Sequence, residues 1–128
     1  MTPKQIVEAI YGAFQRGDIS FILAQLDPDV FWRQPESVPW GGDYKGPEQV
    51  GNFFTKLHEI VETTNFDVED NIEAGNQVIS YGYYGSRNRV TGKTANSRFV
   101  FRWQFQNGKI YHYEAVLDSA PIVAATSP

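Results

Sequence analysis

The chain has 128 residues, a length that suits one domain with one hydrophobic core. Its formal net charge of −4 disfavours a phosphate-binding basic surface, and the absence of cysteine excludes disulfides, thiol nucleophiles and thiolate metal sites. Aromatic residues make up 15% of the chain, and this surplus indicates a β-rich core together with a cavity walled by rings.

The first residues predict two short helices. Thr2-Pro3-Lys4-Gln5 is typical of a capped helix start, and apolar residues then recur at helical spacing from Ile6 to Phe14. Gly17 ends this helix, and Asp18 caps a second helix that stops at Asp27-Pro28.

The next segment predicts a strand and a loop. Val30–Gln34 has the composition of a short strand, and Pro35 closes it. The stretch Glu36–Gly46 is rich in glycine and proline, so we expect a loop. Because this loop carries Trp40 and Tyr44, we expect it to lie over a binding site.

A third helix opens at Pro47-Glu48 and fades at Thr63-Thr64-Asn65. From Phe66 onward the hydrophobic period changes from about 3.6 to about 2, which indicates strands. Four strands are expected, at Phe66–Ala74, from Gln77 to about Val90, at Ser97–Gln106 and from Lys109 to about Asp118, with a hairpin turn at Asn107-Gly108.

Helices followed by an antiparallel meander predict an α+β fold, with the helices packed on one face of a curved, mostly antiparallel sheet. We expect a single domain over residues 1–118 and an irregular tail over residues 119–128. The alternation of residues in the strand Ser97–Gln106 predicts which face of the sheet is buried and which is outer. Its inner residues are Phe99, Phe101, Trp103 and Phe105, and its outer residues include Arg98, Arg102 and Gln104.

The order of these elements resembles the nuclear transport factor 2-like superfamily, especially its SnoaL-like and ketosteroid-isomerase-like branch. The segments that carry the resemblance are Gly17-Asp18, Asp29–Trp32, Tyr44–Val50 leading into Phe53-Phe54, and Asn107–Ile110 with Asp118. The resemblance implies a cone-shaped, cystatin-like roll around a pocket for a small molecule. This fold hosts isomerases, cyclases, hydrolases, dehydratases and binding modules, so the resemblance alone names no reaction.

Ketosteroid isomerase works with an Asp base and an oxyanion hole made by a Tyr and a protonated Asp. The corresponding positions of this chain hold Gln34, Ile10 and Phe101, none of which can take these roles. Tyr11 follows the tyrosine position but is expected to face away from the pocket, by about 100° of helix turn. Steroid-type isomerisation is therefore not expected.

Asp118 is the first candidate catalytic residue, because it resembles the acidic residue of the SnoaL-like cyclases. A carboxyl group near apolar neighbours can serve as a general acid or base. The alternative is a strand-end carboxylate that caps the turn into the tail. Strand alternation places Asp118 on the outer face with His112 and Glu114, so only a bulge or twist would aim it inward.

His58 is the second candidate catalytic residue, because it lies on the flank of the third helix's buried face and can exchange a proton near neutral pH. The alternative is a partly exposed histidine at the boundary of the core. The only other histidine, His112, lies on the outer strand face, and the two lack ligand spacing, so no metal site is expected.

Eight residues are predicted to line the pocket and bind the ligand: Trp32, Gln34, Trp40, Tyr44, Phe54, Phe101, Trp103 and Tyr113. Gln34 and Tyr44 would supply the few polar contacts that orient a bound molecule. The alternative for the apolar members is that they only fill the core.

The outer sheet face is expected to be solvated or to pack against a second copy, which would make the protein a homodimer. Three tyrosines suit such an interface: Tyr83, Tyr84 and Tyr111. A basic patch for an anionic ligand is the alternative for Arg87, Arg89, Lys93, Arg98 and Arg102.

The first functional hypothesis is a cofactor-independent cyclase or isomerase that acts by acid/base chemistry on a hydrophobic carbonyl or ring compound. The alternatives are a non-catalytic ligand-binding module and a protein-interaction module on the same fold. No cofactor, nucleic acid or membrane partner is expected. We expect a cytoplasmic protein, since the N-terminus lacks a signal-peptide pattern and no apolar run reaches membrane-spanning length.

Overall fold

Four helices and six strands follow one another in the computed structural model, which describes all 128 residues. They are α1 (Pro3–Gln15), α2 (Ile19–Ala24), β1 (Leu26–Gln34), β2 (Gly42–Lys45), α3 (Gly46–Ile60), β3 (Val61–Ala74), β4 (Gln77–Asn88), β5 (Thr94–Gln106), β6 (Lys109–Leu117) and α4 (Ala120–Ala124).

The first two helices begin at the predicted caps. The Thr2 side chain accepts from the Gln5 backbone nitrogen at 3.2 Å, and the Gln5 side chain accepts from the Thr2 backbone nitrogen at 2.9 Å. Asp18 accepts from the Phe21 backbone nitrogen at 3.2 Å and starts α2. Each cap satisfies backbone donors that a helix start otherwise leaves unpaired.

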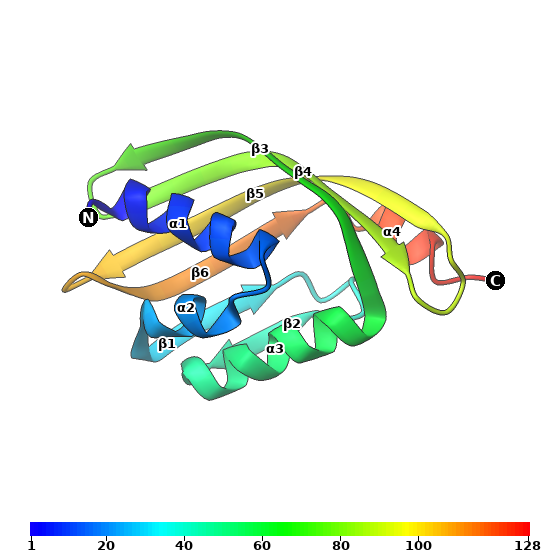
Figure 1. Cartoon of the computed structure of the whole chain (residues 1–128), viewed down its shortest axis with the longest axis horizontal. Coiled ribbons are helices and arrows are strands. Elements are labelled where there is room, and N and C mark those ends of the chain that lie inside the picture. The colour runs from blue at the N-terminus through cyan, green and yellow to red at the C-terminus, as the bar shows by residue number, and fades with distance from the viewer.

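The six strands form one sheet in the order β2-β1-β6-β5-β4-β3, and all neighbours are antiparallel except β1 and β6. Figure 1 shows α1, α2 and α3 on one side of this curved sheet. The buried apolar residues form one cluster of 26 members. The α+β fold with helices on one face of a curved sheet is therefore confirmed, and the helices and the sheet enclose the core.

The prediction of a loop from Glu36 to Gly46 is partly wrong, because Gly42–Lys45 form the strand β2. This short strand pairs with the end of β1, and Arg33 and Asp43, which lie opposite each other, form an ion pair at 3.1 Å. The sequence does not predict β2, because a strand of four residues that begins at Gly42 is too short to show a clear alternation of apolar and polar residues.

The expected irregular tail also contains regular structure. Residues Ala120–Ala124 form α4, whose Ile122 is buried, and the Ala125 carbonyl accepts from the Thr91 hydroxyl at 2.6 Å. Contact with β5 and with the β4–β5 turn stabilises this short helix, which is too short to be stable alone.

The third helix ends earlier than expected, and β3 begins directly after it. The Ile60 carbonyl accepts from the Arg89 backbone nitrogen, and Val61 pairs with Asn88 of β4. The β-branched residues at the start of β3 are thus strand residues rather than a fading helix.

The long hairpin of β3 and β4 bends over the helical layer. Its register shifts twice, between Thr63 and Asn65 and between Val68 and Asp70. Gly82 of β4 permits the second shift, because a Cβ at this position would collide with the backbone carbonyl of Asp67. Such irregularities bend a strand and increase its twist. The bend helps to close the roll over the core.

We predict that Gly82→Ala destabilises the protein by roughly 1–3 kcal/mol, because the added methyl meets rigid backbone rather than a movable side chain. Gly12→Ala is the matched control. Gly12 lies inside α1, and the nearest atom to its added Cβ is a nitrogen of Arg16 at 3.5 Å, so this change should stabilise by about 0.5–1 kcal/mol. Urea unfolding measures both values, and equal effects of the two variants would contradict the role of Gly82.

Candidate functional site

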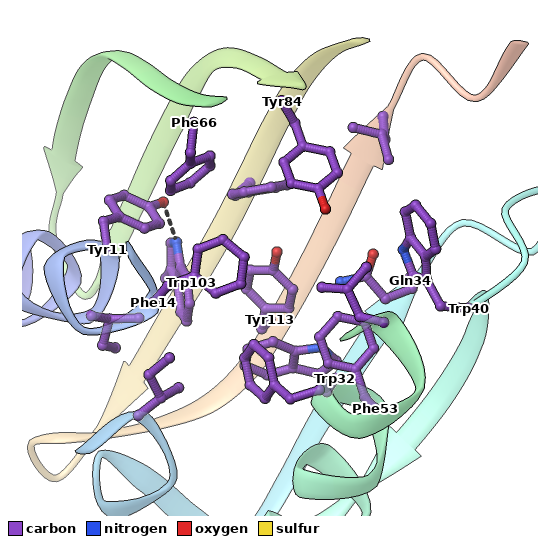
Figure 2. A pocket seen from close by; sticks show the side chains of 16 residues that line it. Tyr11, Phe14, Trp32, Gln34, Trp40, Phe53, Phe66, Tyr84, Trp103 and Tyr113 are labelled. Carbon is purple, nitrogen blue, oxygen red and sulfur yellow. Dashed lines mark hydrogen bonds between the residues drawn. The ribbon is translucent and has the colours of Figure 1, made fainter. Parts of the chain in front are cut away.

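A cavity of about 70 Å³ lies between the helices and the inner face of the sheet. It is lined by sixteen residues, of which fifteen are hydrophobic. They come from three helices, five strands and the β1–β2 loop (Figure 2): Ile10, Tyr11, Phe14, Ile22, Trp32, Gln34, Trp40, Phe53, Phe54, Leu57, Phe66, Tyr84, Phe101, Trp103, Tyr113 and Leu117.

Three rings on adjacent strands form the sheet side of the cavity. Trp32 of β1 lies opposite Tyr113 of β6, which in turn lies opposite Trp103 of β5. Ring centroids are 4.0 Å apart for Trp32 and Tyr113 and 4.3 Å apart for Trp103 and Tyr113. Contacts between rings on neighbouring strands stabilise the sheet beyond the contribution of their buried area. The strand register therefore builds this wall.

The helix α1 contributes Tyr11, whose hydroxyl accepts a buried hydrogen bond from the Trp103 indole nitrogen at 2.8 Å. The expectation that Tyr11 faces away from the pocket is wrong. Tyr11 is 8% exposed and shares a helical stripe with Val7, Ile10 and Phe14, which is wide enough to include two successive residues. Burial raises the pKa of Tyr11 above its usual value.

Polar groups gather at the end of the cavity formed by the carboxyl end of β1. Figure 2 shows the Gln34 amide and the hydroxyls of Tyr84 and Tyr113 around the same space. Burial raises the pKa of Tyr84 to about 12, and burial raises the pKa of Tyr113 well above its usual value, although the Gln34 side chain opposes the latter shift. These tyrosines are neutral at physiological pH and can donate hydrogen bonds.

The indole nitrogen of Trp32 is buried and has no hydrogen-bond partner in the protein. A buried donor without a partner is costly, because it has lost its hydrogen bonds to water. The donor belongs to a residue of the cavity wall, and Trp32 is only 2% exposed.

Seven of the eight predicted ligand-binding residues line the cavity: Trp32, Gln34, Trp40, Phe54, Phe101, Trp103 and Tyr113. Tyr44 does not. Its hydroxyl donates to the Trp40 carbonyl at 2.8 Å, and its ring packs on Phe53, so it supports the cavity wall from behind.

Neither predicted catalytic residue lines the cavity. Asp118 is exposed just beyond β6, and its backbone nitrogen donates to the Arg98 carbonyl, so no bulge turns it inward. His58 is exposed near the end of α3, with its ring stacked on Phe14 at 6.5 Å. The cavity wall itself contains no carboxylate, imidazole, ammonium or guanidinium group.

Two wall residues that sequence reasoning missed come from the bent hairpin. Tyr84 was expected on the outer face, but it is 6% exposed and lines the cavity. Phe66 was expected only as a strand residue. The alternation of β4, in which Val78, Ser80 and Tyr84 are buried, was the available signal for Tyr84.

The basic residues of β4 and β5 do not gather into one patch. Arg87 pairs with Glu62 at 3.5 Å, and the Arg89 side chain donates to the His58 carbonyl at 2.6 Å. Arg98 contacts the Tyr83 ring, and Arg102 pairs with Glu114. Each of these four arginines therefore has its own partner, and they do not form a joint anion site.

Two further findings concern metals and membranes. No three residues among His, Cys, Asp and Glu gather in a way that can hold a metal ion. None of the four helices combines the length and the apolar character needed to cross a membrane.

The SnoaL-like domain family matches residues 7–113 of the chain. No curated protein matches it. Among solved structures, an NTF2-like protein from Burkholderia thailandensis is 30% identical, with a TM-score of 0.94 and coverage of 100% of this chain and 99% of that one.

Two other solved structures are also similar. An NTF2-like protein of unknown function from Burkholderia pseudomallei is 28% identical, with a TM-score of 0.91 and full coverage of both chains. TerC, crystallised with polyporic acid, is 27% identical, with a TM-score of 0.81 and coverage of 92% of this chain and 93% of its own. The family match over most of the chain, the fold and the position of the cavity agree: the chain belongs to the SnoaL-like domain family, on the NTF2-like fold.

Proposed function

We propose that the protein binds a small, uncharged ring compound bearing a carbonyl or hydroxyl group in the aromatic cavity. The observation that carries the proposal is the composition of the wall, in which fifteen hydrophobic residues surround the single amide of Gln34. A mostly apolar wall with a few placed polar groups is typical of small-molecule sites. A charged ligand would lose its hydration without gaining a counter-ion.

The polar end of the cavity supports the assignment of an oxygen atom to the ligand. The amide of Gln34, which is 5% exposed, can donate to a carbonyl, and the Tyr113 hydroxyl beside it can do the same. The unpartnered Trp32 nitrogen is a third donor in the wall. An acceptor atom on the ligand would offset the cost of burying these donors.

The comparisons support a small-molecule role. Isomerases and cyclases are the activities associated with SnoaL-like and ketosteroid-isomerase-like proteins, and a SnoaL-like polyketide cyclase candidate from Mesorhizobium loti shares the fold. TerC was crystallised with polyporic acid, and this relative is 27% identical over most of its length. These likenesses favour ring compounds as ligands of this chain.

An acid/base cyclase or isomerase that needs no cofactor is the second candidate function. The observation that favours it is the position of His58, whose ring stacks on Phe14, a residue of the cavity wall. The binding role remains the better supported one, because no residue inside the cavity can remove a proton from carbon at neutral pH.

We predict that Gln34→Leu weakens acetophenone binding about tenfold, because a buried hydrogen bond to the carbonyl is lost. Ethylbenzene, which lacks the oxygen, should bind the variant as well as or better than the original protein. Isothermal titration calorimetry measures both affinities. Asp118→Asn is the control, since this exposed residue lies outside the cavity, and neither affinity should change. Equal weakening of both compounds by Gln34→Leu would contradict the role of the amide.

We further propose that the outer sheet face packs against a second copy of the chain. An apolar row crosses three strands there, because Tyr81 pairs with Val100 and Val100 pairs with Val116. Val100 is 43% exposed and Val116 is 59% exposed. Large apolar side chains at the middle of a sheet face are typical of interfaces.

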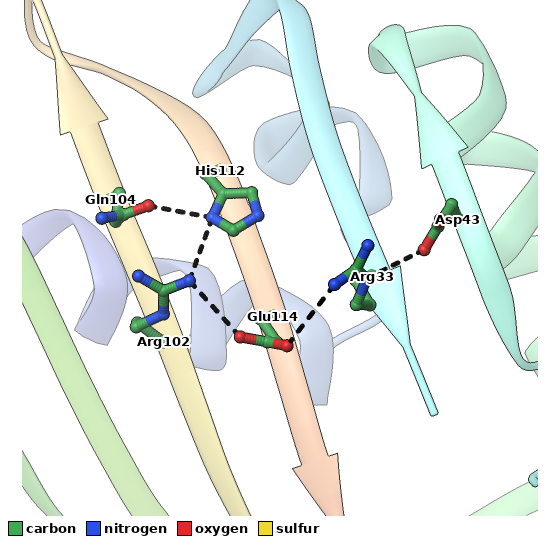
Figure 3. A network of polar contacts seen from close by, with 6 residues as sticks. All are labelled: Arg33, Asp43, Arg102, Gln104, His112 and Glu114. Carbon is green, nitrogen blue, oxygen red and sulfur yellow. Dashed lines mark hydrogen bonds and ion pairs between the residues drawn. The ribbon is translucent and has the colours of Figure 1, made fainter. Parts of the chain in front are cut away.

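Charges of both signs flank this row. Figure 3 shows Arg33 between Asp43 and Glu114, with the far side of Glu114 facing Arg102. Alternating charges are self-complementary under a two-fold axis, so a second copy can pair with them as well. An isologous dimer is therefore the assembly that this surface supports.

We predict that Val116→Glu converts the dimer into a monomer, because the two-fold interface would then bury two glutamates, one from each copy, against the apolar row. Val123→Glu is the matched control. Val123 is 43% exposed, against 59% for Val116, but it lies on α4, away from the outer sheet face. Analytical ultracentrifugation measures the mass. A monomeric unmodified protein would contradict the dimer, and a dimeric Val116→Glu would contradict its placement on the outer sheet face.

The outer-face network also predicts a pH dependence. Burial, and then the charge of Arg102, lower the pKa of His112 below its ordinary value of 6.5, while Glu114 acts in the opposite direction. The unfolded chain therefore binds a proton more readily than the folded protein, and this contribution to stability is complete above about pH 6.5 and is lost as the pH falls.

We predict that the free energy of unfolding falls between pH 7.5 and about pH 5, and that His112→Gln makes this fall smaller. Urea unfolding at a fixed protein concentration over this range measures the difference between the two proteins. A variant whose pH profile parallels that of the original protein would show that His112 is not responsible.

A further inference from the structure

A second hollow lies beside the cavity, between the ends of α1 and α3 and the first residues of β3. It is an open groove of about 450 Å³. Eight of its ten lining residues are not hydrophobic, in contrast to the cavity, and they include Gln15, His58, Thr63 and Asn65. The groove is therefore a polar space adjoining an apolar one.

The cavity and the groove share two walls, Phe14 and Phe66, and no other lining residue is common to both. The two rings meet edge to face, with centroids 5.5 Å apart, and both side chains are half-buried. They lie at the end of the cavity away from Gln34 (Figure 2). Two half-buried side chains thus form the partition, and a change of their rotamers is the smallest movement that would open it.

The cavity is too small for a ring compound while Phe14 and Phe66 keep it separate from the groove. A cavity of about 150 Å³ holds benzene, and drug-sized ligands occupy about 300–1,000 Å³. The cavity of about 70 Å³ is smaller than both, whereas the groove adds about 450 Å³ directly behind Phe14 and Phe66. Displacement of these two side chains would join the two spaces and make room for a ring.

We propose that the groove is the outer half of the ligand site, and that the ligand is amphipathic, with an aromatic ring in the cavity and an uncharged hydrogen-bonding group in the groove. This inference rests on the proposed binding function. A hydrogen bond between the two spaces supports it, because the Thr63 hydroxyl in the groove lies 3.0 Å from the Tyr84 hydroxyl in the cavity wall. A polar chain thus runs from one space to the other.

The charges of the groove favour an uncharged group. Glu62 and Arg89 carry opposite charges, and both already have partners: Glu62 pairs with Arg87 at 3.5 Å, and the Arg89 side chain donates to the His58 carbonyl at 2.6 Å. Neither sign is in excess. The neutral polar groups of the groove are the side chains of Gln15, Thr64 and Asn65, which hydrogen-bond to the Phe66 carbonyl, to Asn65 and to Asp67 respectively. Amides and hydroxyls keep further donor and acceptor capacity, which suits a hydroxyl or carbonyl group on the ligand.

Four probes that share a benzene ring test the inference: ethylbenzene, 2-phenylethanol, phenylacetate and 2-phenylethylammonium. Ethylbenzene measures the cavity alone, and the other three add a neutral, an anionic or a cationic group. Calorimetry should give 2-phenylethanol an affinity about fivefold higher than that of ethylbenzene, because one more hydrogen bond is made. Both charged probes should bind more weakly than the alcohol. In NMR spectra, the alcohol should shift the backbone amides of Thr63, Thr64 and Asn65 more than ethylbenzene does.

The double variant Thr64→Ala/Asn65→Ala removes exposed polar groups of the groove without touching the cavity wall. It should bring the affinity ratio of alcohol to ethylbenzene close to one and leave the affinity for ethylbenzene unchanged. Asn52→Ala is the control, since Asn52 is exposed on α3 outside both spaces, and the ratio should stay near five.

Each other outcome overturns a defined part of the account. If the preference for the alcohol disappears in Gln34→Leu and survives in the groove variant, the hydroxyl lies inside the cavity and the groove is not part of the site. If a charged probe binds more tightly than the alcohol, the assigned ligand class is wrong. In the first case the alcohol still binds inside the cavity, so the proposed function stands although the inference fails. If ethylbenzene and the alcohol both fail to bind, the proposed function fails and the inference with it.

Discussion

The stacked rings of Trp32, Tyr113 and Trp103 are the constraint on which the rest of the structure depends. They touch because β1, β6 and β5 are neighbours in one register, and a shift of one residue in any of these strands would turn a ring to the outer face. Trp103 also holds Tyr11 through a buried hydrogen bond, so the same rings fix α1 on the sheet. Core packing and cavity wall are therefore one set of contacts.

This arrangement limits the chemistry of the cavity. Its tyrosines are neutral, its other polar groups are the Gln34 amide and the indole N–H groups, and no charged side chain lines it. Such a wall can hold and orient a neutral molecule, but proton transfer would have to involve a group outside it. Of the two candidates from the sequence, His58 stacks on a ring of the wall. Fold membership in an enzyme-rich family does not supply the missing acid or base.

Much of the fold and the sheet side of the site could be predicted from the sequence, because strand alternation is a simple signal. Trp32 and Gln34 share one face of β1, and Phe101 and Trp103 share one face of β5. The helix turn of about 100° between Ile10 and Tyr11 did not predict the side that Tyr11 faces, since the buried stripe of α1 is wide enough to include both residues. Other misses were decided by tertiary contacts: β2 exists through pairing with β1, and α4 through packing on β5.

All three tryptophans of the chain line the cavity, and each is 2% exposed, so tryptophan fluorescence reports on this site directly. Titration with acetophenone, corrected for absorbed light, is the most direct measurement of whether the cavity accepts a neutral ring compound with a carbonyl group. The account predicts quenching that saturates with one equivalent bound per chain. Quenching that rises linearly with concentration and never saturates, as expected for random collisions, would contradict it.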